Sequence, residues 1–119
     1  AILLDVAGFV GVDILPETFQ VDTNVVEDVL RHQAMSVDDI KAGDVILLYT
    51  GWANEYWFGG DPAFYFSRGP GFTLDTVLNI FGPKKVLAIG ADSGVLEYTE
   101  AGKLNLPVHV HWIVCHGGV

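Results

Sequence analysis

The sequence predicts an α/β fold with a largely parallel or mixed sheet. Three short apolar runs bounded by turn residues are typical of strands in such a sheet, and they span residues 1–6, 43–49 and 86–91. Two segments between them have the signals of helices, over residues 22–34 and 73–81. Strands that alternate with helices favour parallel pairing, because the helix returns the chain to the same end of the sheet.

The first strand, residues 1–6, reads AILLDV, and glycines and a turn-rich segment follow it. Asp22 or Thr23 can then cap a helix that runs to about Ala34. Its apolar residues recur on one face, which predicts that this face packs against the sheet. The apolar positions are Val25, Val26, Val29 and Leu30.

The second strand lies in GDVILLY, residues 43–49, and Thr50, Gly51 and Trp52 follow it. Such a continuous apolar run predicts a strand that is buried on both faces. The indole of Trp52 therefore comes just after the carboxyl end of a strand, where open α/β sheets bind ligands. Residues 51–72 form a long connection rich in aromatic residues, which predicts a functional loop rather than a disordered one.

The second helix, residues 73–81, is capped by Thr73 and ends before a Gly-Pro pair. The third strand, residues 86–91, leads directly to Asp92 and Ser93. Their side chains are expected at the ligand-binding edge of the sheet. A simple role for Asp92 in capping the following turn is an equal alternative.

Three of the four histidines lie in the last segment, at His109, His111 and His116. If this tail is a strand, His109 and His111 share a face; if it is a helix that begins at Pro107, His109 and His116 share one. Imidazoles are common ligands of zinc, iron, nickel and copper. Two are too few for a catalytic zinc site, which generally has three protein ligands, and a histidine packed in the interior is at least as frequent.

Composition narrows the classes of function. A net charge of −9 with six Lys and Arg residues leaves no basic patch for a phosphate backbone, which excludes nucleic acid as a partner. No apolar stretch reaches the roughly 18 residues of a membrane span, so no membrane partner is expected either. The single cysteine, Cys115, suits a reducing compartment, and we expect a cytoplasmic protein. No Gly-x-Gly-x-x-Gly or Gly-x-Ser-x-Gly motif supports a nucleotide site or a serine hydrolase.

The chain of 119 residues is long enough for a single domain, residues 1–119. Apolar residues make up 50% of it and charged residues only 18%, which is an apolar balance for a domain of this size. We therefore expect a large exposed apolar patch, covered by a further segment or by a second copy of the chain.

The order of the motifs LLDVAG, KAGDVILLYTGW, PGF, VLAIGADS and PVH resembles that of the cyclase-like metal-dependent hydrolases, which include kynurenine formamidases and isatin hydrolases. The resemblance extends over essentially the whole chain. It implies a swivelling β/β/α domain, present here in incomplete form as its C-terminal-side portion. It also implies a homo-oligomer that uses a divalent metal, zinc or manganese, to hydrolyse the amide or lactam C–N bond of a small aromatic substrate.

The family signature, His-x-Gly-Thr-His-x-Asp-x-Pro-x-His, is absent from this sequence. In relatives it supplies most of the metal ligands and lies upstream of the equivalent of Ala1. A further glutamate ligand lies beyond the equivalent of Val119. The resemblance therefore places the principal metal ligands on a missing segment or on a partner chain.

Matching the motifs residue by residue assigns His109, in the PVH step, to the metal site. Trp52 corresponds to an aromatic residue beside the substrate pocket, where its indole would form a planar wall for an aromatic substrate. Phe72, Asp92 and Ser93 are also placed among the substrate-binding residues, the last two in a positional role. The resemblance assigns no catalytic residue within the chain.

Two other functions stay open. The chain could be a non-catalytic scaffold or binding domain with the same fold, or a stand-alone α/β binding protein unrelated to this family. The enzymatic hypothesis depends on one geometric expectation, which is that the imidazole of His109 points into the same cavity that the indole of Trp52 lines.

Overall fold

The structure is a computed structural model that describes all residues from 1 to 119. Strands β1 (Ile2–Asp5), β3 (Val45–Tyr49) and β5 (Ala88–Ala91) form one sheet in the order β1-β3-β5. Both pairings are parallel. The predicted α/β class and the predicted parallel sheet are therefore confirmed.

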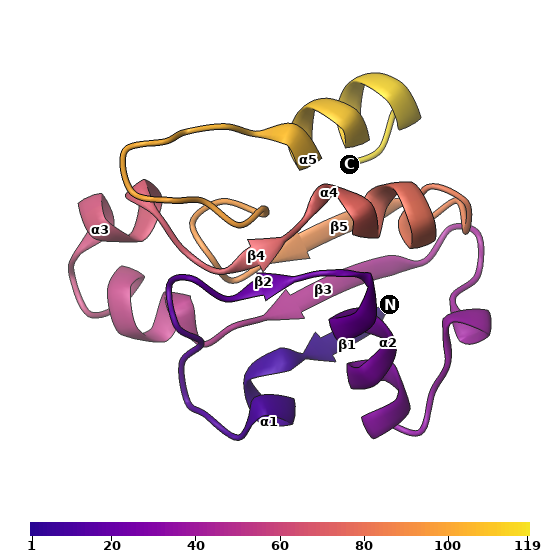
Figure 1. Cartoon of the computed structure of the whole chain (residues 1–119), viewed down its shortest axis with the longest axis horizontal. Helices are drawn as coiled ribbons and strands as arrows, with labels where there is room; N and C mark the ends of the chain where they lie inside the picture. Colours follow the sequence, from indigo (N-terminus) through magenta and orange to yellow (C-terminus); the bar gives the residue numbers. More distant parts are fainter.

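A second parallel pair, β2 (Gln20–Val21) and β4 (Gly71–Phe72), forms a small sheet of its own. In Figure 1 this pair crosses in front of β3 and β5. Val21 and Phe72 are fully buried and belong to the same hydrophobic core as the inward-facing residues of the larger sheet. The two small parallel sheets and their helices give the mixed α/β architecture that agrees with the expected fold class.

Helix α2 (Thr23–His32) forms where the sequence predicted it, with Asp22 as its cap. The carboxylate of Asp22 accepts a hydrogen bond of 2.9 Å from the backbone N–H of Val25, which satisfies one of the free donors at the helix start. At its other end the side-chain amide of Gln33 donates to the carbonyl of Leu3 (2.8 Å) and accepts from the N–H of Asp5 (3.1 Å). The side chain of Gln33 thereby provides hydrogen-bond partners for two backbone groups at the open edge of β1.

Helix α4 (Leu74–Thr76) continues into the wider π-helical turns of η3 (Val77–Phe81), so the predicted helix is confirmed with the predicted bounds. The carboxylate of Asp75 accepts hydrogen bonds from the N–H (2.9 Å) and the hydroxyl (2.7 Å) of Thr23, and one from the hydroxyl of Thr73. Burial raises the pKa of Asp75, but the hydrogen bonds from Thr73 and Thr23 outweigh burial and hold the pKa below its ordinary value.

Asp75→Asn is expected to lower the free energy of unfolding by about 1–2 kcal/mol near neutral pH, because it weakens the bonds that join α4 to the start of α2. Since the pKa is lower in the folded state, the stabilisation is complete above the unfolded value of about 3.9 and is lost as the pH falls through the folded value. Urea unfolding of both proteins as a function of pH measures this. A difference that persists unchanged in strong acid would contradict it.

Several segments differ from the sequence-based expectation. Helix α1 (Val6–Val10) follows β1 directly, in a stretch that the sequence assigned partly to the strand. The long connection is not an irregular loop, because it contains the π-helical segment η2 (Ala53–Trp57) and helix α3 (Pro62–Ser67). Asp61 caps α3, and Pro62 occupies the first helical position, where its missing N–H costs nothing.

The tail is helical, which decides between the two alternatives left open for it. Helix α5 (Pro107–His109) begins at the proline and continues as η4 (Val110–Cys115). Val108 and Trp112 are buried and attach this helix to the core. The carboxyl-terminal Val119 then hydrogen-bonds with the backbone of Leu87 and Ile89 at the outer edge of β5.

The prediction that the strands are buried on both faces is wrong. The side chains of Leu3 and Leu47, which are neighbours across the sheet, are 52% and 43% exposed. Gly90 lies beside Leu47 on β5 and adds no side chain to cover it. The helices and the small sheet cover the opposite face, where Leu4, Ile46 and other residues are buried. One face of the sheet therefore presents apolar side chains to solvent. None of the helices has the length and apolar character needed to cross a membrane.

Candidate functional site

The carboxyl ends of β3 and β5 are joined by a polar network around Asp92. Its Oδ1 accepts hydrogen bonds of 2.7 Å from both the backbone N–H and the hydroxyl of Thr50, which is fully buried. The hydroxyl of Thr50 in turn accepts a hydrogen bond from the N–H of Trp52 (3.2 Å). Asp92 therefore fixes the chain at the point where it leaves β3.

The phenol of Tyr65, in α3, reaches this network from the long connection. Its hydroxyl donates a hydrogen bond of 2.9 Å to the backbone carbonyl of Asp92. Burial raises the pKa of Tyr65, and the negative charge of Asp92 raises it further. The phenol therefore stays protonated and remains a hydrogen-bond donor near neutral pH.

Two buried polar atoms of this region have no hydrogen-bond partner, namely Nε1 of Trp52 and Oδ2 of Asp92. Buried polar groups are almost always paired, because leaving one unpaired costs about 1–3 kcal/mol. The residues left with unpaired atoms are both ones that the resemblance placed at the substrate site. A buried donor and a buried acceptor at the carboxyl edge of the sheet thus have no partner within the chain.

The indole of Trp52 does not border an open cavity in this structure. Trp52 is only 2% exposed, and the ring of Tyr56 packs on it at 4.4 Å between centroids. The ring of Phe64 lies further out, at 6.0 Å. Gly69 approaches the indole so closely that a Cβ there would lie 3.1 Å from Nε1. Contact between Trp52 and a substrate stays a prediction.

Phe72 and Ser93 lie in structural positions. Phe72, in β4, is fully buried in the core and packs edge-on against Phe81 at 5.1 Å. The hydroxyl of Ser93 donates a hydrogen bond of 2.7 Å to the carbonyl of Val95 and stabilises the turn after β5. A role for either residue in substrate binding stays a prediction.

His109 lies at the start of the tail helix, against Glu97. Glu97 is 1% exposed, and its Oε2 contacts Nδ1 of the imidazole while its Oε1 accepts from the backbone N–H of His109 at 3.3 Å. The side chain of His109 is 38% exposed, so it is not enclosed in the apolar interior. Sequence reasoning missed Glu97. Its position between apolar residues and Thr99 was the available signal, but the residue type gave no indication of its partner 12 positions away.

The other histidines do not join His109. His111 and His116 lie near each other, with ring centroids 5.2 Å apart, and His32 packs against Phe9 on α1. No group of three or more His, Cys, Asp or Glu side chains is placed to hold a metal ion. The donor set of this chain therefore fits one oriented ligand of a metal centre and does not complete a centre.

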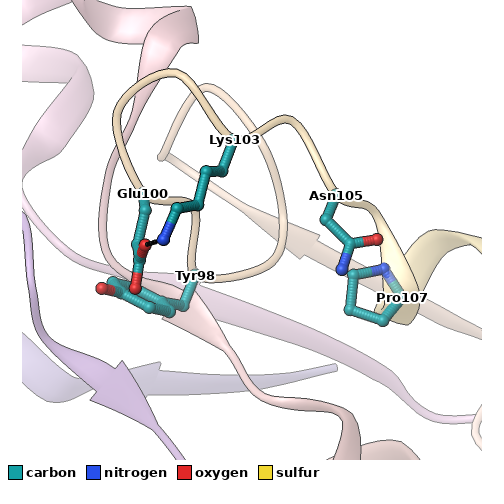
Figure 2. Close-up of a pocket in the computed structure, with 5 residues that line it drawn as sticks. All are labelled: Tyr98, Glu100, Lys103, Asn105 and Pro107. Carbon is teal, nitrogen blue, oxygen red and sulfur yellow. Dashed lines mark hydrogen bonds and ion pairs between the residues drawn. The ribbon is translucent and has the colours of Figure 1, made fainter.

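The cavities of the chain lie beside these residues rather than among them. Figure 2 shows one of about 330 Å³ between Tyr98, Glu100, Lys103, Asn105 and Pro107, with Lys103 bonded to Glu100. Tyr98 follows Glu97, and Pro107 precedes His109 by two positions. A second, of about 540 Å³, lies at the carboxyl ends of β1 and β3 and is lined by Asp5, Asp13 and Glu55 among others. Asp5 serves mainly as a cap for α1, through a hydrogen bond of 2.8 Å from Gly8.

Neither the indole of Trp52 nor the imidazole of His109 lines any of the main cavities. The expectation that both rings face one cavity is therefore not met within this chain. A chain of contacts nevertheless links the two residues. Gly69 packs against the indole of Trp52 and pairs with Thr99, which lies two residues after Glu97, the partner of His109.

Comparisons with known proteins bear on this arrangement. The model of the Cyclase family ("Putative cyclase") matches residues 1–98. Among solved structures, the chain is similar to one described as the crystal structure of a novel cyclase, with 26% sequence identity and a TM-score of 0.77. That similarity covers 94% of this chain and 36% of the other chain, so this chain spans about a third of its length. No curated protein matches the chain.

The matched segment contains all the strands and all the residues of the polar network around Asp92. It stops just after Glu97, before the tail helix that carries His109. The structural similarity extends over 94% of the chain. Because the family model covers well over half of the sequence, this protein belongs to the cyclase family.

Proposed function

We propose that residues 1–119 form part of a metal-dependent hydrolase that cleaves the amide or lactam C–N bond of a small aromatic substrate, as formamidases and isatin hydrolases do. The observation that carries the proposal is the contact between His109 and Glu97. A histidine that binds a metal usually donates its other ring N–H to a carboxylate or carbonyl, and His109 has such a partner.

His109 would supply one ligand, and the remaining ligands would come from residues outside this chain. A bound divalent ion, zinc or manganese, would lower the pKa of its water and polarise a substrate carbonyl. This chain contributes the fixed position of the imidazole and the polar atoms at the ends of β3 and β5.

The open face of the sheet supports an assembled state. Leu3 and Leu47 are large apolar residues that are about half exposed on adjacent strands. Apolar patches of this kind usually mark an interface. We propose that this face is covered in the active protein, in which the chain forms a homo-oligomer.

The test uses the full-length natural protein that contains this chain. Metal content is measured after purification, and hydrolysis of an N-formyl arylamine and of isatin is measured with and without a chelator. We expect about one equivalent of zinc or manganese per site and loss of hydrolysis on chelation. His109→Ala should lower kcat/KM by about 100-fold or more, since loss of a ligand exceeds the 10–100-fold effect typical of an outer partner.

His111→Ala is the matched control, because His111 lies on the same helix and contacts His116 rather than Glu97. It should leave kcat/KM nearly unchanged. A full-length protein that binds no divalent metal and hydrolyses neither substrate would instead indicate a scaffold or binding domain of the cyclase fold.

A further inference from the structure

We propose that Glu97 is the positioning residue for His109. Its carboxylate accepts a hydrogen bond from the N–H at Nδ1 of the imidazole, which keeps the ring proton on Nδ1 and leaves the lone pair of Nε2 free for a divalent metal ion. The inference rests on the proposed function, because it concerns the same site, but it assigns a role to a residue that neither the sequence motifs nor the family comparison identified.

The carboxylate of Glu97 is committed to His109. It is 1% exposed, and both of its oxygens contact His109, one at the ring and one at the backbone N–H. No Lys or Arg pairs with it. Nδ1 lies against this buried group, while the His109 side chain as a whole is 38% exposed.

The fold holds Glu97 rigidly. Its neighbours pair with β4 on both sides, through hydrogen bonds from the N–H of Phe72 to the carbonyl of Leu96 (3.1 Å) and from the N–H of Tyr98 to the carbonyl of Phe72 (3.0 Å). Gly71 allows this close approach, since a Cβ there would lie 2.4 Å from the carbonyl carbon of Glu97. These backbone hydrogen bonds fix the segment that carries the carboxylate, and a ligand is best supported by a residue whose own position is fixed.

His109 is held from the other side by the start of helix α5. Pro107 opens the helix, and Val108, fully buried, anchors it to the core. The backbone N–H of His109 is one of the free donors of the first helical turn, and Oε1 of Glu97 satisfies it. The same carboxylate thus fixes both the helix start and the orientation of the ring.

The hydrogen-bonding pattern predicts an unusually sharp response to Glu97→Gln. The backbone N–H of His109 can only donate, so the glutamine must turn its oxygen toward it. Its NH₂ group then faces Nδ1 and donates, which forces the ring proton onto Nε2. The substitution preserves size and shape but reverses the tautomer and removes the lone pair that a metal needs.

The test is ¹⁵N NMR of the imidazole rings in the metal-free chain, at a pH where His109 is neutral by its own chemical shifts. In the wild type we expect the proton of His109 on Nδ1, and in Glu97→Gln on Nε2. The matched control is Glu100→Gln, which alters an exposed carboxylate of the same segment that contacts Lys103 instead. It should leave the His109 tautomer unchanged.

A titration with Zn²⁺ alone, followed at the His109 resonances, gives a second readout. We expect the midpoint for His109 to rise by about 10-fold or more in Glu97→Gln and to stay constant in Glu100→Gln. A wild-type tautomer with the proton on Nε2 would overturn the inference, and this measurement does not depend on whether the variant folds. Equal midpoints in a folded Glu97→Gln variant would also overturn it. Failure of this inference is distinguishable from failure of the proposed hydrolase, because metal content and hydrolysis of the full-length protein test the hydrolase separately.

Discussion

Gly51→Ala is expected to lower the free energy of unfolding by about 3 kcal/mol or more, which is a large fraction of the 5–15 kcal/mol typical of a domain. Gly51 has a φ of +78°, a conformation that costs an alanine about 1–2 kcal/mol. A Cβ would also lie 2.0 Å from the carbonyl oxygen of Asp13, whose segment is held in place by the hydrogen bond from Leu15 to Thr50. The glycine therefore explains how the chain turns from β3 into the buried indole of Trp52.

Gly43→Ala separates the two causes. Gly43 also has a positive φ, of +87°, but no atom lies within 4 Å of the position of its Cβ. It should cost only about 1–2 kcal/mol, from the backbone conformation alone. Chemical unfolding followed by circular dichroism compares the two variants. Equal losses would show that the close approach of Asp13 to Gly51 is absent in solution.

Asp92→Ala is expected to cost about 2–4 kcal/mol, the second large effect on stability. It would leave the N–H and the hydroxyl of the fully buried Thr50 without their shared acceptor. Asp92→Asn keeps one acceptor oxygen and should cost only about 1–2 kcal/mol. The same unfolding measurement orders the three proteins.

Asp28→Ala serves as the control for loss of a carboxylate. Asp28 pairs with Arg31 on the exposed side of α2, where both side chains are at least half exposed. Such pairs contribute little, so the change should stay within about 0.5 kcal/mol. If Asp92→Ala were as mild as this control, Asp92 would not bind Thr50 in the folded protein.

The regular elements could be predicted because their signals are local. The apolar run before Thr50 and the capped periodicity after Asp22 specify a strand and a helix within a few residues. Alternation of such elements is enough to predict parallel pairing. The signature residues of the resemblance lie mostly in these same segments, so the family was also accessible from the sequence.

The sequence did not show which face of the sheet is buried, because burial depends on which other segments pack against each face. A strand with apolar residues on both faces is expected to be covered on both, and Leu47 meets the sequence criterion as well as Ile46 does. In the structure Ile46 is fully buried and Leu47 is 43% exposed. The sequence of a strand shows which residues are suited to burial. It does not show which other segments of the protein cover each face of the strand.

The site was predicted only in part for a similar reason. His109 was assigned to the metal site through its motif, which stays a prediction, and the structure gives it a partly exposed side chain with a carboxylate partner. Glu97 was missed, because its contact with His109 depends on the bridge between its segment and β4 and on the start of α5. Trp52 was predicted as an open wall, but Tyr56 and Phe64 cover it, and their helices lie in the segment that the sequence described as a loop.

The central claim is that Nε2 of His109 is a metal ligand while Glu97 holds Nδ1. A crystal structure of the full-length protein with zinc, with anomalous scattering recorded at the zinc edge, tests it most directly. We predict an anomalous peak at about 2.0–2.1 Å from Nε2 of His109, with Nδ1 still in contact with Glu97. A peak bound at Nδ1, or a fully loaded metal site from which His109 is absent, would contradict the account.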